Sequence, residues 1–133
     1  MANVFVYGSL KRGHALYYLE PLVELRLEVL PARVRPALLY NLGPFPGMVL
    51  KSNGGWVVGE VHSFDNVSKV LEILDEVEEY YGAEDPNNLY RRVEHGAELL
   101  NGAGRVACWL YEYVGPLERA QVLENGIWHG MER

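Results

Sequence analysis

The sequence predicts an α+β protein in which an antiparallel sheet or barrel packs against one helix. Two observations favour this class. Short apolar and β-branched runs alternate with turns containing Gly and Pro along most of the chain. A single segment, residues 66–79, instead carries apolar residues at helical spacing. With 133 residues, the chain is expected to form one domain, residues 1–133, with a core of its own.

The predicted strands are bounded by turn residues and comprise, in chain order, residues 4–7, 25–40, 48–50, 56–64, 89–94 and 105–114. Residues 14–18 are expected to form a helical turn. Pro31 and Pro36 are expected to interrupt the second strand, because proline breaks regular structure. The segment Asn53-Gly54-Gly55 predicts a hairpin turn. Residues 117–133 show no clear pattern.

The first predicted strand leads into a candidate binding loop. Gly8 and Ser9 follow the apolar residues 4–7 directly. Glycine permits a sharp turn and the close approach of another group. A loop at the end of a buried strand can direct several backbone N–H groups at one point, which suits a carboxylate or a polarised carbonyl. The alternative is an ordinary connecting loop.

The predicted helix places a carboxylate in line with its apolar side chains. Asp65 is expected to be the N-cap. At about 100° per residue, Glu78 points to the middle of the apolar face, whereas Glu76 and Glu79 point elsewhere. Burial would raise the pKa of Glu78, as in a general acid or base. The alternative is a frayed last turn with Glu78 in water. The apolar face consists of Val67, Val70, Leu71 and Leu74.

Other polar residues are assigned structural roles. Ser9 lacks a G-x-S-x-G context and Asp–His support, so its hydroxyl is interpreted as orienting the loop or a ligand. The four histidines lack metal-ligand spacing and are interpreted as structural or solvated. Glu72 and Asp75 are interpreted as surface charge. Three tyrosines that end or interrupt strands are interpreted as core residues with the hydroxyl at the rim: Tyr7, Tyr90 and Tyr111.

Composition excludes several classes of partner. The net charge is −6 without a basic run, which disfavours nucleic acid. No apolar stretch has transmembrane length, and Lys11 and Arg12 interrupt any N-terminal signal. The single cysteine, Cys108, lies in an apolar run, which favours a reducing compartment. We therefore expect a cytoplasmic protein without a membrane partner.

An ordered set of motifs resembles a known family. Residues 6–13, Val-Tyr-Gly-Ser-Leu-Lys-Arg-Gly, resemble the opening signature of the γ-glutamylcyclotransferase-like (AIG2-like) proteins. Residues 74–78, Leu-Asp-Glu-Val-Glu, are similar to that family's helix end. The resemblance covers residues 3 to about 113. The loop 80–89 is longer than in compact members of the family, and the tail, residues 117–133, has no clear counterpart in it. Further motifs in the expected order are Phe45-Pro-Gly47, Val58-Gly-Glu-Val61, Tyr90-Arg-Arg92 and Trp109-Leu-Tyr111.

The resemblance implies a small mixed β-barrel with flanking helices and a cavity at its mouth. The implied reaction is intramolecular aminolysis of a small-molecule γ-glutamyl donor, which releases 5-oxoproline and an amine without a cofactor or metal. Glu78 would be the acid/base. Two alternatives stay open: a non-catalytic binding module for an acidic metabolite, and a different transferase or hydrolase that uses Glu78. The expected substrate-binding residues are Tyr7, Gly8, Ser9, Leu10, Tyr90 and Tyr111.

Overall fold

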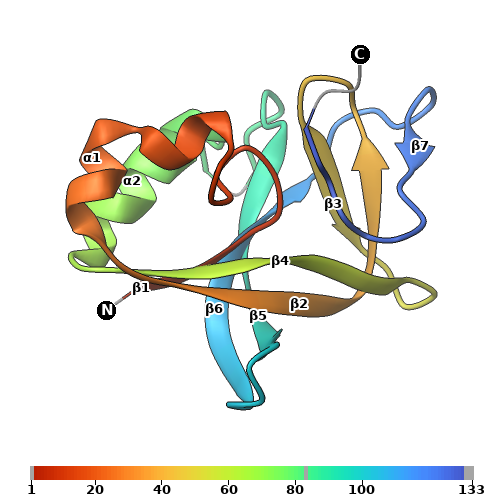
Figure 1. Cartoon of the computed structure of the whole chain (residues 1–133). Helices are drawn as coiled ribbons and strands as arrows, with labels where there is room; N and C mark the ends of the chain where they lie inside the picture. The colour runs from red at the N-terminus through yellow and green to blue at the C-terminus, as the bar shows by residue number, and fades with distance from the viewer. Residues whose placement is uncertain (1, 83, 131–133) are drawn as a thin grey trace.

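The computed structural model describes residues 2–82 and 84–130, and its centre is a closed five-stranded barrel. The strands follow the order β2-β4-β1-β6-β5, and pairing of Ala32 and Arg33 in β2 with β5 closes the ring. β1 and β6 are parallel, whereas the other neighbouring pairs are antiparallel. The predicted mixed barrel is therefore confirmed (Figure 1). Its strands are β1 (Ala2–Val6), β2 (Arg26–Asn41), β4 (Gly55–Phe64), β5 (Tyr90–Leu99) and β6 (Arg105–Tyr113).

The remaining elements lie on two sides of the barrel. Two further strands, β3 (Pro46–Leu50) and β7 (Gln121–Val122), pair with the second half of β2. Figure 1 shows α1 (Glu20–Leu25) and α2 (Val67–Val77) together on the opposite side from β3 and β7. The 3-10 helix η1 (Ala15–Tyr18) precedes α1. None of the helices in the described part of the chain is long and apolar enough to cross a membrane.

Two apolar clusters form the core. The first fills the barrel with side chains from all five ring strands, including Phe5, Val34, Val57, Ala97 and Leu110. The second lies between the barrel and the helices, where Leu22, Val70 and Leu74 contact outward-facing strand residues. Successive side chains of a strand point to opposite faces, so β1 contributes to both clusters. The loop that follows β1 consequently begins where barrel and helices meet.

The predicted hairpin at Asn53-Gly54-Gly55 is wrong. A turn is present, since the Gly54 N–H donates to the Lys51 carbonyl at 2.8 Å. However, β3 and β4 both pair with β2, on its two sides, and not with each other. A Cβ atom at Gly54 would lie 2.5 Å from the Ala37 carbonyl carbon. The turn therefore crosses directly against the β2 backbone, where only glycine fits.

Only one of the two prolines changes the path of β2. Pro31 pairs with Glu60 in unbroken register, so the predicted interruption there is wrong. The Pro31 carbonyl accepts from the Leu100 N–H at 3.0 Å, on the side away from β4, so the missing N–H of Pro31 costs no hydrogen bond to β4. Near Pro36 the register between β2 and β4 shifts, as predicted. Helix α1 was not predicted, because six residues are too few to show helical periodicity.

Candidate active site

A cavity of about 140 Å³ opens between the loop after β1 and the C-terminal end of α2. The second cluster of the core lies beneath it, and Phe45 and Pro46 form a wall on the side of β3. All seven residues predicted to form the site line this one cavity. They are Tyr7, Gly8, Ser9, Leu10, Glu78, Tyr90 and Tyr111.

Helix α2 begins at a different cap from the one predicted. Asn66, not Asp65, is the N-cap, and its side chain accepts from the Lys69 N–H at 3.3 Å. Asn66 adopts a left-handed backbone conformation (φ 56°), which asparagine tolerates better than most residues. The Asp65 carboxylate instead accepts from the Asn66 N–H at 3.0 Å. Adjacent Asp and Asn residues are both good caps, so composition alone does not distinguish them.

The C-terminal end of α2 sets the position of Glu78. The last helical residue is Val77, and Glu78 is the C-cap. The Glu79 N–H donates to the Glu76 carbonyl and the Tyr80 N–H to the Asp75 carbonyl, which is the hydrogen-bond pattern of a Schellman motif. Glu79 takes the left-handed position (φ 52°) that usually belongs to glycine. The chain reverses immediately after Glu78 and leaves its side chain at the cavity.

Helical periodicity predicted the buried side of α2 correctly at Val70 and Leu74, whereas Leu71, predicted on the same face, is only partly buried. Val70 and Leu74 are fully buried, and Glu76 is exposed. Val67 is 40% exposed, so its predicted place on the buried face is wrong.

Glu78 is the one cavity-lining residue with a strongly perturbed carboxyl group. Desolvation by burial raises its pKa from 4.5 to about 7, in the direction predicted from the helix. The carboxylate forms no hydrogen bond with any other residue in the described ranges. Burial raises the pKa of the Tyr7 and Tyr90 phenols, and the nearby negative charge of ionised Glu78 raises both further. Glu78 therefore has no hydrogen-bond partner among residues 2–82 and 84–130, and burial brings its pKa close to neutral pH.

The loop after β1 brings three residues, 8–10, to the wall of the same cavity. The Lys11 N–H donates to the Gly8 carbonyl at 3.0 Å, which closes a turn with Ser9 and Leu10 at its centre. The amide N–H groups of Gly8, Ser9 and Leu10 donate to no residue within 2–82 or 84–130. A Cβ atom at Gly8 would lie 2.8 Å from two ring atoms of Pro46. Gly8 is thus required because the Pro46 ring approaches its backbone closely; its φ is not positive.

The three predicted tyrosines line the cavity, but each hydroxyl already donates within the protein. Tyr7 donates to the Tyr111 carbonyl at 2.5 Å and accepts from the Met48 N–H. Tyr90 donates to the Pro46 carbonyl at 2.8 Å. Tyr111 donates to the Asp75 carboxylate at 2.6 Å. Their phenols therefore fix the cavity walls and are not free to donate to a ligand.

Asp75 was misinterpreted as surface charge. Its carboxylate accepts from the Tyr111 hydroxyl and from the Arg92 guanidinium, each at 2.6 Å. Arg92 also lies over the rings of Tyr80 and Trp109. This cluster ties the last turn of α2, which leads to Glu78, to β5 and β6. The motif spacing gives no signal for it, because Asp75 and Tyr111 are 36 positions apart.

Ser9 and the histidines show no constellation typical of nucleophilic or metal-dependent catalysis. Ser9 is partly exposed at the cavity, and its hydroxyl bonds to none of the described residues. The described part of the chain contains no group of three or more His, Cys, Asp or Glu side chains placed to hold a metal ion. His62 is fully buried in a hydrogen-bonded cluster with Glu60 and Arg26.

Comparisons with known proteins agree with the predicted family. A family model described as "Gamma-glutamyl cyclotransferase, AIG2-like" matches residues 4–130. A Niallia circulans protein named gamma-L-glutamyl-butirosin B gamma-glutamyl cyclotransferase is 30% identical over 113 residues, which cover 85% of this chain and 67% of that protein. The gamma-glutamylcyclotransferase family protein ytfP of Citrobacter rodentium is 30% identical over 128 residues, 95% of this chain and 94% of its own.

Solved structures agree on the fold. An AIG2-like protein from Mus musculus superposes with a TM-score of 0.69 at 23% identity, covering 93% of this chain and 86% of its own. The protein ytfP from Escherichia coli superposes with a TM-score of 0.61 at 28% identity, covering 96% of each chain. Together with the family match over residues 4–130, these likenesses show that the chain belongs to the AIG2-like family of γ-glutamyl cyclotransferases.

Proposed function

We propose that this protein converts a γ-glutamyl donor into 5-oxoproline and a free amine. The observation that carries the proposal is the meeting, in one small cavity, of an unpartnered Glu78 carboxylate with the amide groups of residues 8–10. The first is suited to proton transfer and the second to holding oxygen atoms. Both groups come from segments, residues 6–13 and 74–78, that resemble motifs of the family.

The proposed reaction needs one proton carrier. The α-amine of the donor attacks its own γ-carbonyl carbon, a C–N bond forms, and the original amide C–N bond breaks. Glu78 accepts a proton from the α-ammonium and returns it to the departing nitrogen. The second proton that the attacking nitrogen loses as the lactam forms passes to the released amine, which ends as an ammonium. A pKa of about 7 suits both steps, because a general acid–base group works best when its pKa lies near the working pH.

The loop after β1 is proposed to bind the glutamyl part of the donor. Amides of Gly8, Ser9 and Leu10 would donate to the donor's carboxylate and to the γ-carbonyl oxygen as negative charge develops on it. Nucleophile and electrophile belong to one molecule, so the cavity mainly has to hold the donor folded for attack. At about 140 Å³ the cavity is small, and a bulky leaving group would extend beyond its mouth.

The relatives' names guide the choice of donors for a direct test. One relative is named for cyclotransfer on a γ-glutamyl group carried by butirosin B. The wild-type protein should be incubated with γ-glutamyl amino acids, γ-glutamylamines and glutathione, and 5-oxoproline measured by mass spectrometry. Release of 5-oxoproline with an equal amount of amine from at least one donor is expected.

The same screen separates the alternatives. Binding of a donor without turnover would favour a non-catalytic binding module. Release of amine together with glutamate, instead of 5-oxoproline, would favour a hydrolase that uses Glu78 to activate water. We also infer a cytoplasmic location, because Cys108 is a free cysteine, as is typical of proteins in a reducing compartment.

A further inference from the structure

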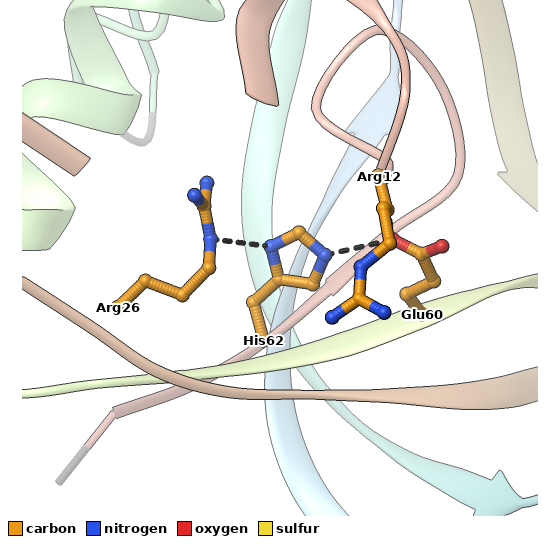
Figure 2. A network of polar contacts seen from close by, with 4 residues as sticks. All are labelled: Arg12, Arg26, Glu60 and His62. Atoms are coloured by element: carbon orange, nitrogen blue, oxygen red, sulfur yellow. Dashed lines mark hydrogen bonds and ion pairs between the residues drawn. The ribbon is translucent and has the colours of Figure 1, made fainter. Parts of the chain in front are cut away.

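A chain of hydrogen bonds joins the loop after β1 (residues 7–12, here called the cavity loop) to β2 and β4. Figure 2 shows Arg26, His62 and Glu60 in line, with Arg12 of the loop beside the Glu60 carboxylate. We propose that Glu60 and His62 are positioning residues that set the place of the Gly8–Leu10 amides, and hence the affinity for substrate. The effect on affinity rests on the proposed function, whereas the effect on the loop does not.

The direction of the hydrogen bonds follows from the chemistry of the side chains. A guanidinium can only donate, so the Arg26 Nε–H donates to His62 Nδ1 at 3.3 Å. A neutral imidazole with Nδ1 as acceptor carries its hydrogen on Nε2. His62 Nε2–H therefore donates to Glu60 Oε1 at 2.9 Å. Both ends of the histidine are occupied, which fixes the orientation of its ring.

Burial prevents His62 from turning to other partners. The residue is 0% exposed. The Tyr17 ring of η1 lies edge-on to it with the ring centroids 5.9 Å apart, and the Arg26 guanidinium lies over the same Tyr17 ring. Desolvation and the neighbouring Arg26 lower the pKa of His62, against the opposing effect of Glu60, so the ring stays neutral. A neutral, immobile histidine holds the Glu60 carboxylate in one place.

Glu60 fixes both ends of the cavity loop. Its backbone pairs with Val6, the last residue of β1. Its Oε1 accepts from the Arg12 N–H at 2.8 Å, so one residue of β4 holds the chain before and after residues 7–11. Ser9 and Leu10 lie between these two points. A displacement of the Glu60 carboxylate would move the exit of the turn and, with it, the free amides.

Other contacts hold the loop from its opposite side. The Lys11 ammonium donates to the Trp128 carbonyl at 2.6 Å. Gly8 packs against Pro46. Glu60 makes neither of these contacts, although its charge lies near the Lys11 ammonium, so removal of its carboxylate should shift the loop without unfolding the barrel.

The test compares two substitutions of Glu60. Glu60→Ala removes the acceptor for Arg12, whereas Glu60→Gln keeps an oxygen that can accept from Arg12 and from His62. We expect the KM of the best donor to rise about tenfold in Glu60→Ala, the factor that corresponds to about 1.4 kcal/mol. It should stay within about threefold of wild type in Glu60→Gln, because a neutral acceptor weakens the hydrogen bond without removing it. Glu94→Ala, which removes an exposed carboxylate of β5, is the matched control.

A merely structural role would have a different signature. Loss of folded protein lowers the apparent kcat and the melting temperature but leaves KM unchanged. His62→Phe, which keeps a ring and removes both hydrogen bonds, should raise KM in the same direction by a smaller factor, because the Arg12–Glu60 bond survives. An unchanged KM in Glu60→Ala would overturn the proposal, and an unchanged KM in His62→Phe would remove His62 from it.

A second readout does not depend on activity. The ¹H–¹⁵N signals of Gly8, Ser9 and Leu10 should move in Glu60→Ala and stay near their wild-type positions in Glu60→Gln and Glu94→Ala. Signals that remain in place in Glu60→Ala would overturn the positioning role. If wild type formed no 5-oxoproline, the proposed function would fail while this readout still decided the effect on the loop.

Discussion

At the scale of single residues, the burial of Glu78 lowers the stability of the folded protein at neutral pH but suits the carboxyl group to the proposed proton transfer. The folded protein keeps the carboxyl group in a desolvated place, where its pKa is about 7 instead of 4.5. A carboxyl with a raised pKa binds its proton more tightly in the folded than in the unfolded chain. Its contribution to stability is therefore complete below pH 4.5 and is lost as the pH rises through 7.

Replacing Glu78 by glutamine should reveal this cost. Glu78→Gln should be more stable than wild type at pH 8 by up to about 3 kcal/mol, with the advantage shrinking toward pH 5. Solvent in the cavity will reduce the effect. Urea denaturation at several pH values measures the difference. Glu76→Gln, which changes an exposed residue of the same helix, is the control. A pH-independent difference in Glu78→Gln would show that Glu78 titrates as a free glutamate.

Gly8 and Ser9 should respond differently to alanine. A methyl group at Gly8 meets the rigid ring of Pro46 at 2.8 Å, so Gly8→Ala should displace the loop or the wall and lower both kcat/KM and the melting temperature. Ser9→Ala should lower activity modestly. Gly55→Ala is the steric control, because nothing lies within 4 Å of its added Cβ. Normal kinetics in Gly8→Ala would contradict the close packing of the loop against Pro46. A covalent adduct on Ser9 in the wild type would instead show that Ser9 acts as a nucleophile.

At the scale of elements, the end of α2 is fastened to two strands. Asp75 bonds to Arg92 of β5 and to Tyr111 of β6, three residues before Glu78. The helix end also carries Glu79 in a left-handed conformation, which is unfavourable for a residue with a side chain. The tie to the strands offsets this local strain and keeps the C-cap residue Glu78 at the cavity.

Removing the Asp75 carboxylate should affect stability and turnover together. Asp75→Ala leaves the Tyr111 hydroxyl and the Arg92 guanidinium without their acceptor, so unfolding should become easier by about 1–3 kcal/mol. The helix end should loosen and kcat should fall. Chemical denaturation and steady-state kinetics on the same preparation measure both effects. Glu72→Ala, an exposed position one turn earlier, should change neither; an unchanged kcat in Asp75→Ala would separate this cluster from the site.

Sequence periodicity predicted the local part of this arrangement. Val70, Leu74 and the position of Glu78 repeat at helical spacing, and the burial of one face follows from that spacing. The end of the helix at Val77 was missed, because Glu79 occupies a position where glycine is the usual signal. The Asp75–Tyr111 contact depends on how distant strands are placed. The pairing of β3 and β4 with β2 could not be predicted either, because the turn between β3 and β4 does not determine which strand each of them pairs with.

At the scale of the whole molecule, the tail completes the wall behind the loop. β7 pairs with β2, the Val58 N–H donates to the Gly126 carbonyl at 2.8 Å, and the Trp128 carbonyl holds Lys11. Trp128 is buried against the barrel core. The sequence showed no pattern in this segment, because single long-range contacts and not a repeating element hold it in place. The tail therefore contributes to the site without lining the cavity.

Gly126 is the position at which the tail is most sensitive. It has a φ of +66°, and an added Cβ would lie 2.0 Å from the Trp56 carbonyl oxygen. Gly126→Ala should reduce the free energy of unfolding by about 2–4 kcal/mol and shift Trp fluorescence toward that of an exposed indole. Gly102→Ala shares the positive φ but meets nothing within 4 Å, so it should cost only about 1 kcal/mol. Equal losses in the two variants would mean that the tail is not packed as described.

The most direct test of the whole account is the rate of 5-oxoproline formation in wild type and Glu78→Gln, measured side by side with the best donor. Glutamine keeps the volume of the side chain but cannot carry the proton. The rate should fall by about 10²–10⁴-fold, the usual contribution of a general acid–base group, while thermal unfolding stays cooperative with a melting temperature no lower than that of wild type. Glu76→Gln should keep the wild-type rate. A folded Glu78→Gln variant with a rate within about tenfold of wild type would contradict the assignment of Glu78 as the proton carrier.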